Sequence, residues 1–339
     1  MPESERLALP TSLAGGNSAV YTVFMSDSLC FFGIDGGGTH SRLALTDING
    51  KVIATANSGS TNIFSSAKNE VFENISNLLD SGLKTAGLGR QNLAAGCIGS
   101  AGLGREREQK LFREFFDSIL QPGFPVKICG DAEILLCGAL AGLEGYCLIA
   151  GTGSIAMGRC ASGGLVRSGG HGYMLGDEGS AAWIGRTAIA RTLRSLENRD
   201  LPTGMAASIL EATGLSHSED LVRYVHHDAD KAKIAKLAPV IDKAGIAGDI
   251  LATDILNIAA AELATLAESV ITRSPEIKRK ELALAGGVIE NSGTVAKKLK
   301  EALAEKFPEL SVFSPKGSAL EGASILAMEE RAKAGNGRI

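Results

Sequence analysis

Asp35 stands at the edge of a glycine-rich stretch that offers the first candidate chemistry in this sequence. The segment Gly-Ile-Asp-Gly-Gly-Gly-Thr-His, residues 33–40, follows a short apolar run. Consecutive glycines suit neither a helix nor a strand, but they let backbone approach a ligand closely. Amide groups in such a bend can bind an anion, and a nearby carboxylate can hold magnesium. The structural alternative is a tight turn in which Asp35 caps the backbone.

A second glycine loop, residues 151–154, has the same setting between two apolar runs. Only the first loop carries a carboxylate, because Ala150 stands where Asp35 would stand. The pattern predicts an internal duplication, in which two related domains each present a glycine hairpin. Two facing loops could hold a polyphosphate between them. A shift of 115 residues aligns Ile34 with Ile149, Gly36 with Gly151, Gly38 with Gly153, and Thr39 with Ser154.

The residues after the first loop exclude two common nucleotide-binding motifs. Asn49-Gly50 separates two strand-like runs, 43–47 and 52–56, and this indicates an antiparallel hairpin. The loop therefore joins two strands, whereas a Rossmann fold requires a helix directly after its glycines. The glycine-lysine signature of a P-loop is missing as well.

Asp131 is the candidate catalytic group outside the glycine loops. It follows the strand-like run 126–129 and opens a helical pattern, which is a common place for a functional side chain. A carboxylate there could accept a proton from an attacking hydroxyl group. Aspartate is also a good helix N-cap, and the residues themselves leave both interpretations open.

These groups must be positioned by the strands and helices around them. Strand-like and helical patterns alternate along the chain, which predicts an α/β domain with a mixed sheet. Apolar spacing predicts strands over 93–99, 126–129, 282–285 and 310–313, and helices over 68–87, 105–119, about 291–306 and about 318–331. Residues 195–275 are predicted to be mostly helical, because apolar positions recur there at helical spacing.

Composition limits the classes of function. The 339 residues suffice for two domains, and 45% hydrophobic with 21% charged residues is typical of a globular protein. The net charge of −4 argues against a nucleic-acid partner, and the absence of an apolar run of about 18 residues argues against a membrane span. The six cysteines form no C-x-x-C pair, which predicts buried free thiols in a reducing cytoplasm.

Residues 1–28 look separate from the globular pattern. They lack the basic and apolar regions of a signal peptide. We expect an extended or disordered N-terminal segment, with Met25 as an alternative start.

Four motifs occur in a fixed order: GIDGGGT, AGTGS, GGHGYMLGDEGSAAWIG and LAGGV. Over about residues 30–330 the chain resembles the sugar kinases of the actin–hexokinase–Hsp70 superfamily. Within that superfamily it resembles the N-acetylglucosamine kinase group of the BadF/BadG/BcrA/BcrD-type ATPase family. The resemblance implies duplicated ribonuclease-H-like domains with mixed five-stranded sheets flanking a nucleotide cleft. It places the first domain at 29–144 with a returning helix at 318–332, and the second at 145–317 with a helical insertion at about 195–275.

The resemblance also implies roles for individual residues. Asp35 would lie near magnesium, and Asp131 would be the base for the sugar hydroxyl. The phosphates and the nucleoside would contact Gly36, Gly37, Gly38, Thr39, Gly151, Thr152, Gly153, Ser154, Gly286 and Gly287. The sugar would contact Asn62, Phe64, Asp131, Gly170, His171, Gly172 and Asp177.

The implied activity is an ATP-dependent amino-sugar kinase that phosphorylates the 6-hydroxyl of N-acetylglucosamine or a close relative with MgATP. Glucosamine and N-acetylmuramic acid are alternative substrates. A different class, the ATPase activator of an iron–sulfur dehydratase, is the other alternative. The segment GGHGYMLGDEG favours the kinase. The resemblance also implies a cytoplasmic homodimer that binds small molecules.

Overall fold

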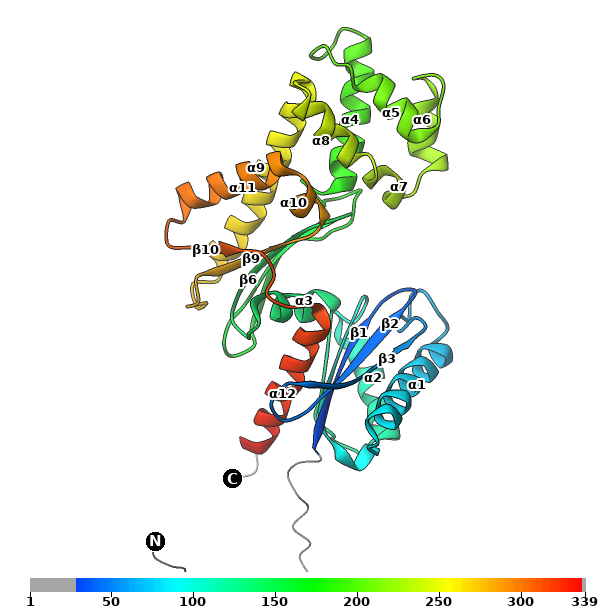
Figure 1. Cartoon of the computed structure of the whole chain (residues 1–339), viewed down its shortest axis with the longest axis vertical. Coiled ribbons are helices and arrows are strands. Elements are labelled where there is room, and N and C mark those ends of the chain that lie inside the picture. The colour runs from blue at the N-terminus through cyan, green and yellow to red at the C-terminus, as the bar shows by residue number, and fades with distance from the viewer. Residues whose placement is uncertain (1–28, 337–339) are drawn as a thin grey trace, which may run out of the picture.

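The computed structural model describes residues 29–336, so the segment 1–28, expected to be extended or disordered, lies outside the described residues. The described chain forms two mixed five-stranded sheets. They are stacked along the long axis of the molecule, with two helices at their junction (Figure 1). The predicted α/β class is thereby confirmed.

The first sheet is built around the hairpin that carries the first glycine loop. Strand β1 pairs antiparallel with β2 and parallel with β4, and the spatial order is β3-β2-β1-β4-β5. The strands are β1 (Cys30–Gly36), β2 (Ser41–Thr46), β3 (Val52–Ser58), β4 (Leu93–Ser100) and β5 (Val126–Cys129).

The second sheet repeats this arrangement. Its order is β10-β9-β6-β7-β8, so its first strand again pairs antiparallel with the second and parallel with the fourth. The predicted duplication is confirmed by this topology. The strands are β6 (Gly145–Ala150), β7 (Ser154–Arg159), β8 (Leu165–Gly169), β9 (Glu281–Ala285) and β10 (Ser311–Phe313).

The equivalence of Thr39 with Ser154 is wrong in detail. Ser154 is the first residue of β7, paired with Ala150, whereas Thr39 lies in the bend before β2 begins at Ser41. The first loop is therefore longer by one residue, 37–40 against 151–153. Ser41 begins β2 as Ser154 begins β7, and both are buried.

Helices cover the two faces of the first sheet. Helix α1 places Val71, Ile75 and Leu79 in the core against β2 and β3 and ends at Gly87, whose φ of 69° suits glycine. The helices of this part are α1 (Lys68–Ala86), the 3-10 turn Arg90–Asn92, α2 (Glu106–Ile119), α3 (Asp131–Leu140) and α12 (Ala319–Asn336).

The second sheet carries the larger set of helices, which begins at Ala181, before the predicted boundary of about 195. This region also contains a π-helical turn, Tyr224–Asp228. The helices are α4 (Ala181–Leu196), α5 (Met205–Thr213), α6 (Asp220–Arg223), α7 (Lys231–Ala235), α8 (Ala238–Ile246), α9 (Ile250–Arg273), α10 (Gly287–Asn291) and α11 (Gly293–Lys306).

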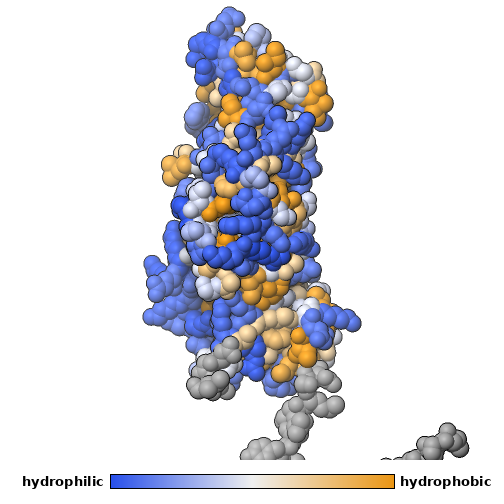
Figure 2. Space-filling model, turned by 90° about the vertical axis from the view of Figure 1, so that its left-hand side faces the viewer, coloured by the Kyte–Doolittle hydropathy of each residue, from blue (hydrophilic) through white to orange (hydrophobic). Residues whose placement is uncertain are grey.

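Helix α9 is the one described helix that is long and apolar enough to cross a membrane by length and composition. It packs against β6, β7 and β8, as well as against α8 and α11, and buries leucines such as Leu256 and Leu263 completely. These contacts are those of a core helix. On the face shown in Figure 2, hydrophobic residues form small separate groups among hydrophilic ones.

Helix α3 lies between the two sheets, and α12 starts at this junction and runs along the first sheet (Figure 1). Both helices belong to a core that includes residues of both sheets. They cross with backbone almost in contact, because a side chain at Gly322 would collide with the carbonyl of Ile134. All six cysteines are buried and free, as predicted, and Cys137 and Cys147 belong to this shared core.

Candidate functional site

A cleft of about 630 Å³ lies where the two sheets and the two junction helices meet. It brings together six of the predicted site residues, from both halves of the chain. They are Asp35, Asp131, Gly153, Ser154, Gly170 and Asp177, with Arg42, Ala132, Leu135, Ile149, Ile155, Ser318 and Ala319 completing the lining. The cleft thus holds three carboxylates, those of Asp35, Asp131 and Asp177, together with Gly153 of the second glycine loop.

Asp35 lines the cleft from the next-to-last position of β1. Its Oδ2 accepts a hydrogen bond from Nη2 of Arg42, at 2.6 Å. Arg42 is its register partner on β2, so the hairpin itself fixes this pair. The Asp35 side chain is 21% exposed and the Arg42 side chain 57% exposed, so solvent screens the pair only in part. Among residues 29–336, the other carboxylate oxygen of Asp35 has no hydrogen-bond partner, so it could bind a ligand.

Asp131 is the first residue of α3, and Gly130 is the N-cap. The N-cap alternative for Asp131 is therefore wrong. Its Oδ1 accepts a hydrogen bond from the amide of Ala132 at 2.9 Å, which orients the carboxylate at the positive end of the helix. The side chain is exposed and faces the cleft. This geometry leaves Asp131 available to an incoming hydroxyl group.

The two glycine loops bend without left-handed glycines. None of Gly36, Gly37, Gly38, Gly151 and Gly153 has a positive φ. Their lack of a side chain matters through close approach instead: a Cβ at Gly36 would lie 2.7 Å from Ser100, and one at Gly153 would lie 2.8 Å from the Asp177 carboxylate.

Some backbone amides of these loops donate hydrogen bonds within the loops themselves. The amide of Gly37 donates to the carbonyl of His40 at 3.1 Å, and that of Gly151 donates to the carbonyl of Gly153 at 2.9 Å. Between residues 29 and 336, the amides of Gly38, Thr39 and Thr152 have no such partner. These amides are the ones that a phosphate could use.

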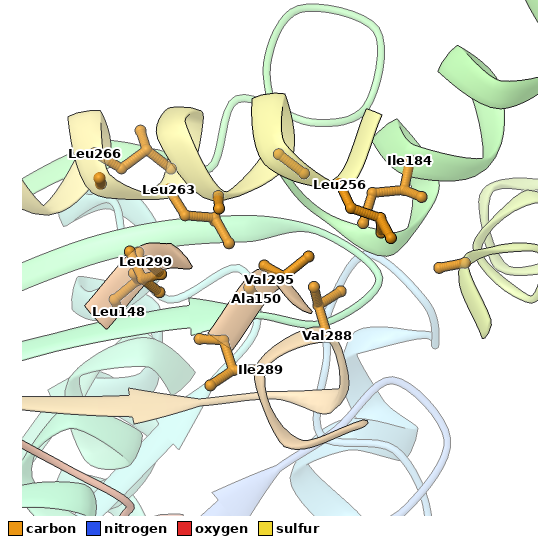
Figure 3. Close-up of a cluster of buried hydrophobic side chains, with 14 of the residues drawn as sticks. Leu148, Ala150, Ile184, Leu256, Leu263, Leu266, Val288, Ile289, Val295 and Leu299 are labelled. Atoms are coloured by element: carbon orange, nitrogen blue, oxygen red, sulfur yellow. The ribbon is translucent and has the colours of Figure 1, made fainter. Parts of the chain in front are cut away.

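A second pocket of about 570 Å³ adjoins the second loop. Gly151 and Thr152 line it together with Gly287 and Val288, and Ile184 and Leu256 supply apolar walls. Figure 3 shows Leu256, Leu263 and Leu266 of α9 above the strand, and Val288 and Ile289 below it in the same apolar cluster. Such a mixed apolar and bare-backbone pocket suits a planar nucleoside.

Gly286 does not line this pocket itself, but it precedes Gly287 and lies against the second loop. Its φ is 102°, and a Cβ there would lie 2.6 Å from the carbonyl carbon and oxygen of Ala150. Only glycine therefore lets β9 turn into α10 so close to the second loop. Gly287 is different, since a Cβ on it would meet only Asn291, at 3.5 Å.

Asp177 is buried in the cleft wall with an unusual backbone φ of 60°. Its Oδ2 pairs with Nζ of Lys231 at 2.6 Å, and its Oδ1 accepts a long hydrogen bond of 3.4 Å from the amide of Ser154. The sequence analysis missed Lys231. No local motif marks it, and 54 residues separate it from Asp177.

Four predicted sugar contacts do not line the cleft: Asn62, Phe64, His171 and Gly172. Asn62 uses Oδ1 to accept a hydrogen bond from the amide of Phe64, at 2.9 Å, and Phe64 is 64% exposed above Gly102. His171 lies on the exposed stretch 170–175. The roles of these residues stay predictions.

The fold is thus that of a two-domain protein whose duplicated α/β halves face each other across a cleft, with a nucleoside-sized pocket beside it. The sequence matches the BadF/BadG/BcrA/BcrD ATPase family over residues 32–327. The chain belongs to this family.

Individual relatives agree with this assignment. An N-acetylmuramic acid/N-acetylglucosamine kinase from Clostridium acetobutylicum is 35% identical over 300 residues, which cover 88% of this chain and 98% of the relative. An N-acetyl-D-glucosamine kinase from Dictyostelium discoideum is 28% identical, covering 89% and 98%. The crystal structure of a candidate N-acetylglucosamine kinase from Chromobacterium violaceum is similar with a TM-score of 0.63 and 26% identity, covering 89% and 99%.

Proposed function

We propose that this chain is an ATP-dependent amino-sugar kinase that phosphorylates the 6-hydroxyl of N-acetylglucosamine or a close relative. One observation carries the proposal: a single cleft gathers Asp131, Asp35 and the second glycine loop beside a nucleoside-sized pocket. The names of the relatives support an amino-sugar acceptor. N-acetylmuramic acid and glucosamine remain alternative acceptors.

In this proposal Asp131 is the general base. The acceptor oxygen forms a bond to the γ-phosphorus while the bond from that phosphorus to the bridging oxygen of ADP breaks. The hydroxyl proton passes to the Asp131 carboxylate. Such a base contributes about 10²–10⁴ in rate, and alignment of the two reactants contributes more.

Asp35 is the proposed residue for magnesium. One of its oxygens is engaged by Arg42, and within the described part of the chain no three His, Cys, Asp or Glu side chains cluster around a common point. Magnesium commonly uses one or two carboxylates and completes its shell with phosphates and water, so a lone carboxylate fits. When bound, the ion would neutralise charge on the phosphates.

The Asp131→Asn variant tests the proposal. We expect kcat to fall by at least about 100-fold, because the variant cannot accept the proton. Binding of a non-hydrolysable ATP analogue should persist, since Asp131 does not line the nucleoside pocket. A coupled ADP-release assay across N-acetylglucosamine, glucosamine and N-acetylmuramic acid measures both the activity and the preferred acceptor. A variant that keeps a third of wild-type turnover would refute the role of Asp131.

The proposal also covers the domain boundaries and the oligomeric state of the protein. We place the first domain at 29–144 with the helix at 318–332, and the second at 145–317 with the insertion at about 195–275, because the two sheets fall on either side of residue 144 and α12 packs on the first. We also propose a cytoplasmic homodimer. The activator alternative needs cysteine ligands at a shared surface, and every cysteine is buried, so nothing in the structure favours it.

A further inference from the structure

Lys231 stands at the boundary between the two hollows of the site. Its neighbour in the sequence, Ala232, lines the nucleoside-sized pocket, while its ammonium group contacts Asp177, which lines the cleft. The second glycine loop crosses the same boundary, with Thr152 in the pocket and Gly153 in the cleft. A nucleotide with its base in the pocket and its last phosphate in the cleft would have to pass Lys231.

The ammonium group is held directly against this loop. A Cβ placed on Gly153 would lie 2.7 Å from Nζ of Lys231, so a side chain at this position would push the ammonium group away from the loop. Lys231 remains 32% exposed, whereas the Asp177 side chain is 4% exposed. A buried carboxylate thus holds a partly exposed cation at the point where the chain of phosphates would run.

We propose that Lys231 binds the terminal phosphates of the nucleotide, and that its ion pair with Asp177 is the alternative contact in the nucleotide-free protein. This inference rests on the proposed kinase function and adds a residue to its nucleotide site. A lysine ammonium binds phosphate as a point charge with three donors. As Lys231 turns to the phosphates, Oδ2 of Asp177 becomes available to a hydroxyl group of the acceptor.

The test measures binding of a non-hydrolysable ATP analogue and of adenosine by titration calorimetry. In Lys231→Met we expect the ATP analogue to bind about 10- to 100-fold more weakly, the usual loss for a hydrogen bond to a charged group. Adenosine has no phosphates, so its affinity should not change. Lys231→Arg keeps the charge and should retain most of the affinity for the analogue.

Lys233→Met is the matched control. Lys233 lies in the same short helix, but its ammonium group donates to the carbonyl of Asp228 at 2.9 Å, a residue that lines neither hollow. Its loss should leave both affinities unchanged. Thermal unfolding of each variant shows whether it is folded. Should Lys231→Met not fold, the comparison of Lys231→Arg with Lys231→Gln decides in the same way, since only arginine keeps the charge.

A double-mutant cycle tests the exchange of partners. Asp177→Asn frees the ammonium group and should strengthen binding of the ATP analogue, and this gain should vanish in the Lys231→Met background. If Asp177→Asn still strengthens binding of the analogue in that background, the effect comes from the lost negative charge alone. That result would overturn the exchange of Lys231 between Asp177 and the phosphates. Unchanged analogue affinity in Lys231→Met, or an equal loss for adenosine, would overturn the phosphate contact.

The measurement of adenosine binding distinguishes a failure of this inference from a failure of the proposed function. A wild-type protein that binds neither adenosine nor the ATP analogue contradicts the kinase proposal itself. A wild-type protein that binds both and phosphorylates an amino sugar, with Lys231→Met indistinguishable from it, contradicts only the role of Lys231.

Discussion

Asp35 is the residue whose charge should decide the magnesium requirement. Asp35→Asn keeps the size of the side chain but removes the negative charge beside the cleft. We expect the magnesium concentration for half-maximal activity to rise by about 10-fold or more, since the loss of a direct ligand should cost at least as much as the loss of a supporting one. A magnesium titration of sugar phosphorylation measures this. Arg42→Gln, which leaves the carboxylate in place, is the control, and an unchanged requirement in Asp35→Asn would contradict the assignment.

Gly286 and Gly287 are neighbours with different expected effects. Gly286→Ala forces a side chain onto a φ of 102° and against the carbonyl of Ala150, so we expect a loss of about 1–3 kcal/mol in the free energy of unfolding. Gly287→Ala meets only Asn291 at 3.5 Å, and it should keep the stability while weakening ATP binding, because Gly287 lines the nucleoside pocket. Urea unfolding and calorimetry separate the two effects. Equal stability losses would contradict this view.

Single residues were predictable where the sequence carried a local signal. Asp35 follows a strand within a glycine-rich run, and Asp131 follows a strand directly, so both could be selected from the chain alone. Lys231 could not, because its importance arises from a contact with Asp177 across 54 residues. The partner of Asp35 was missed for a related reason, since Arg42 becomes its neighbour only through the register of the hairpin.

At the scale of elements, Arg159 on β7 ties the second sheet to both junction helices. It is fully buried and pairs with Glu133 of α3 at 3.4 Å and with Glu329 of α12 at 2.5 Å. It also donates to the carbonyl of Leu143 at 2.8 Å. Glu133 lies two residues after Asp131, so this network also supports the helix that carries the proposed base.

Removal of this cation should be costly. Arg159→Met leaves Glu133 and Glu329 paired, within the described part of the chain, only with Lys127 and Lys333, and we expect a loss of at most about 3–5 kcal/mol in the free energy of unfolding, the cost of a buried charge left without a partner. Arg199→Met is the control, because Arg199 forms an exposed pair with Glu197, and such a pair contributes about 1 kcal/mol or less. Chemical denaturation compares them. A loss in Arg159→Met no larger than that of the control would show that the network does not hold the junction.

Helices and strands whose apolar residues recur with a clear periodicity were predicted well, and an element without such a pattern was missed. Helices α1 and α2 match their apolar spacing, and the Asn-Gly turn correctly marked the hairpin of β2 and β3. Strand β8 went unnoticed because its five residues, Leu-Val-Arg-Ser-Gly, are half exposed and carry little apolar pattern. The helical region begins earlier than expected because Ser180 caps α4 by accepting from the amide of Trp183.

At the scale of the whole molecule, the duplication could be predicted from two short glycine loops in the sequence. The way in which the two halves pack against each other could not. The shared core draws apolar residues from β1, α3, β6, β9 and α12, segments that no local pattern connects. Small residues such as Gly138 and Gly322 let α3 and α12 cross closely at the junction. Tertiary packing of this kind depends on volumes that a periodicity analysis does not measure.

The buried thiols of this shared core, together with Cys30 in the core of the first sheet, make the stability of the protein depend on pH. Burial raises the pKa of Cys30 to about 11 and the pKa values of Cys137 and Cys147 to about 12, against about 8.5 for an exposed thiol in the unfolded chain. The folded protein then holds protons that the unfolded chain releases. The stabilisation is complete below about pH 8.5 and is lost as the pH rises toward the folded pKa values near 11–12.

We therefore expect the free energy of unfolding to fall steadily above about pH 9, and urea denaturation at a series of pH values measures this slope. Lysines also titrate in this range, so the Cys137→Ala/Cys147→Ala variant isolates the thiols. It should be less stable at neutral pH because two buried groups are lost. Its stability should nevertheless decline less steeply with pH, since two of the four thiols whose pKa is raised are gone. Identical slopes in the two proteins would mean that the shared core opens to water before the thiols ionise.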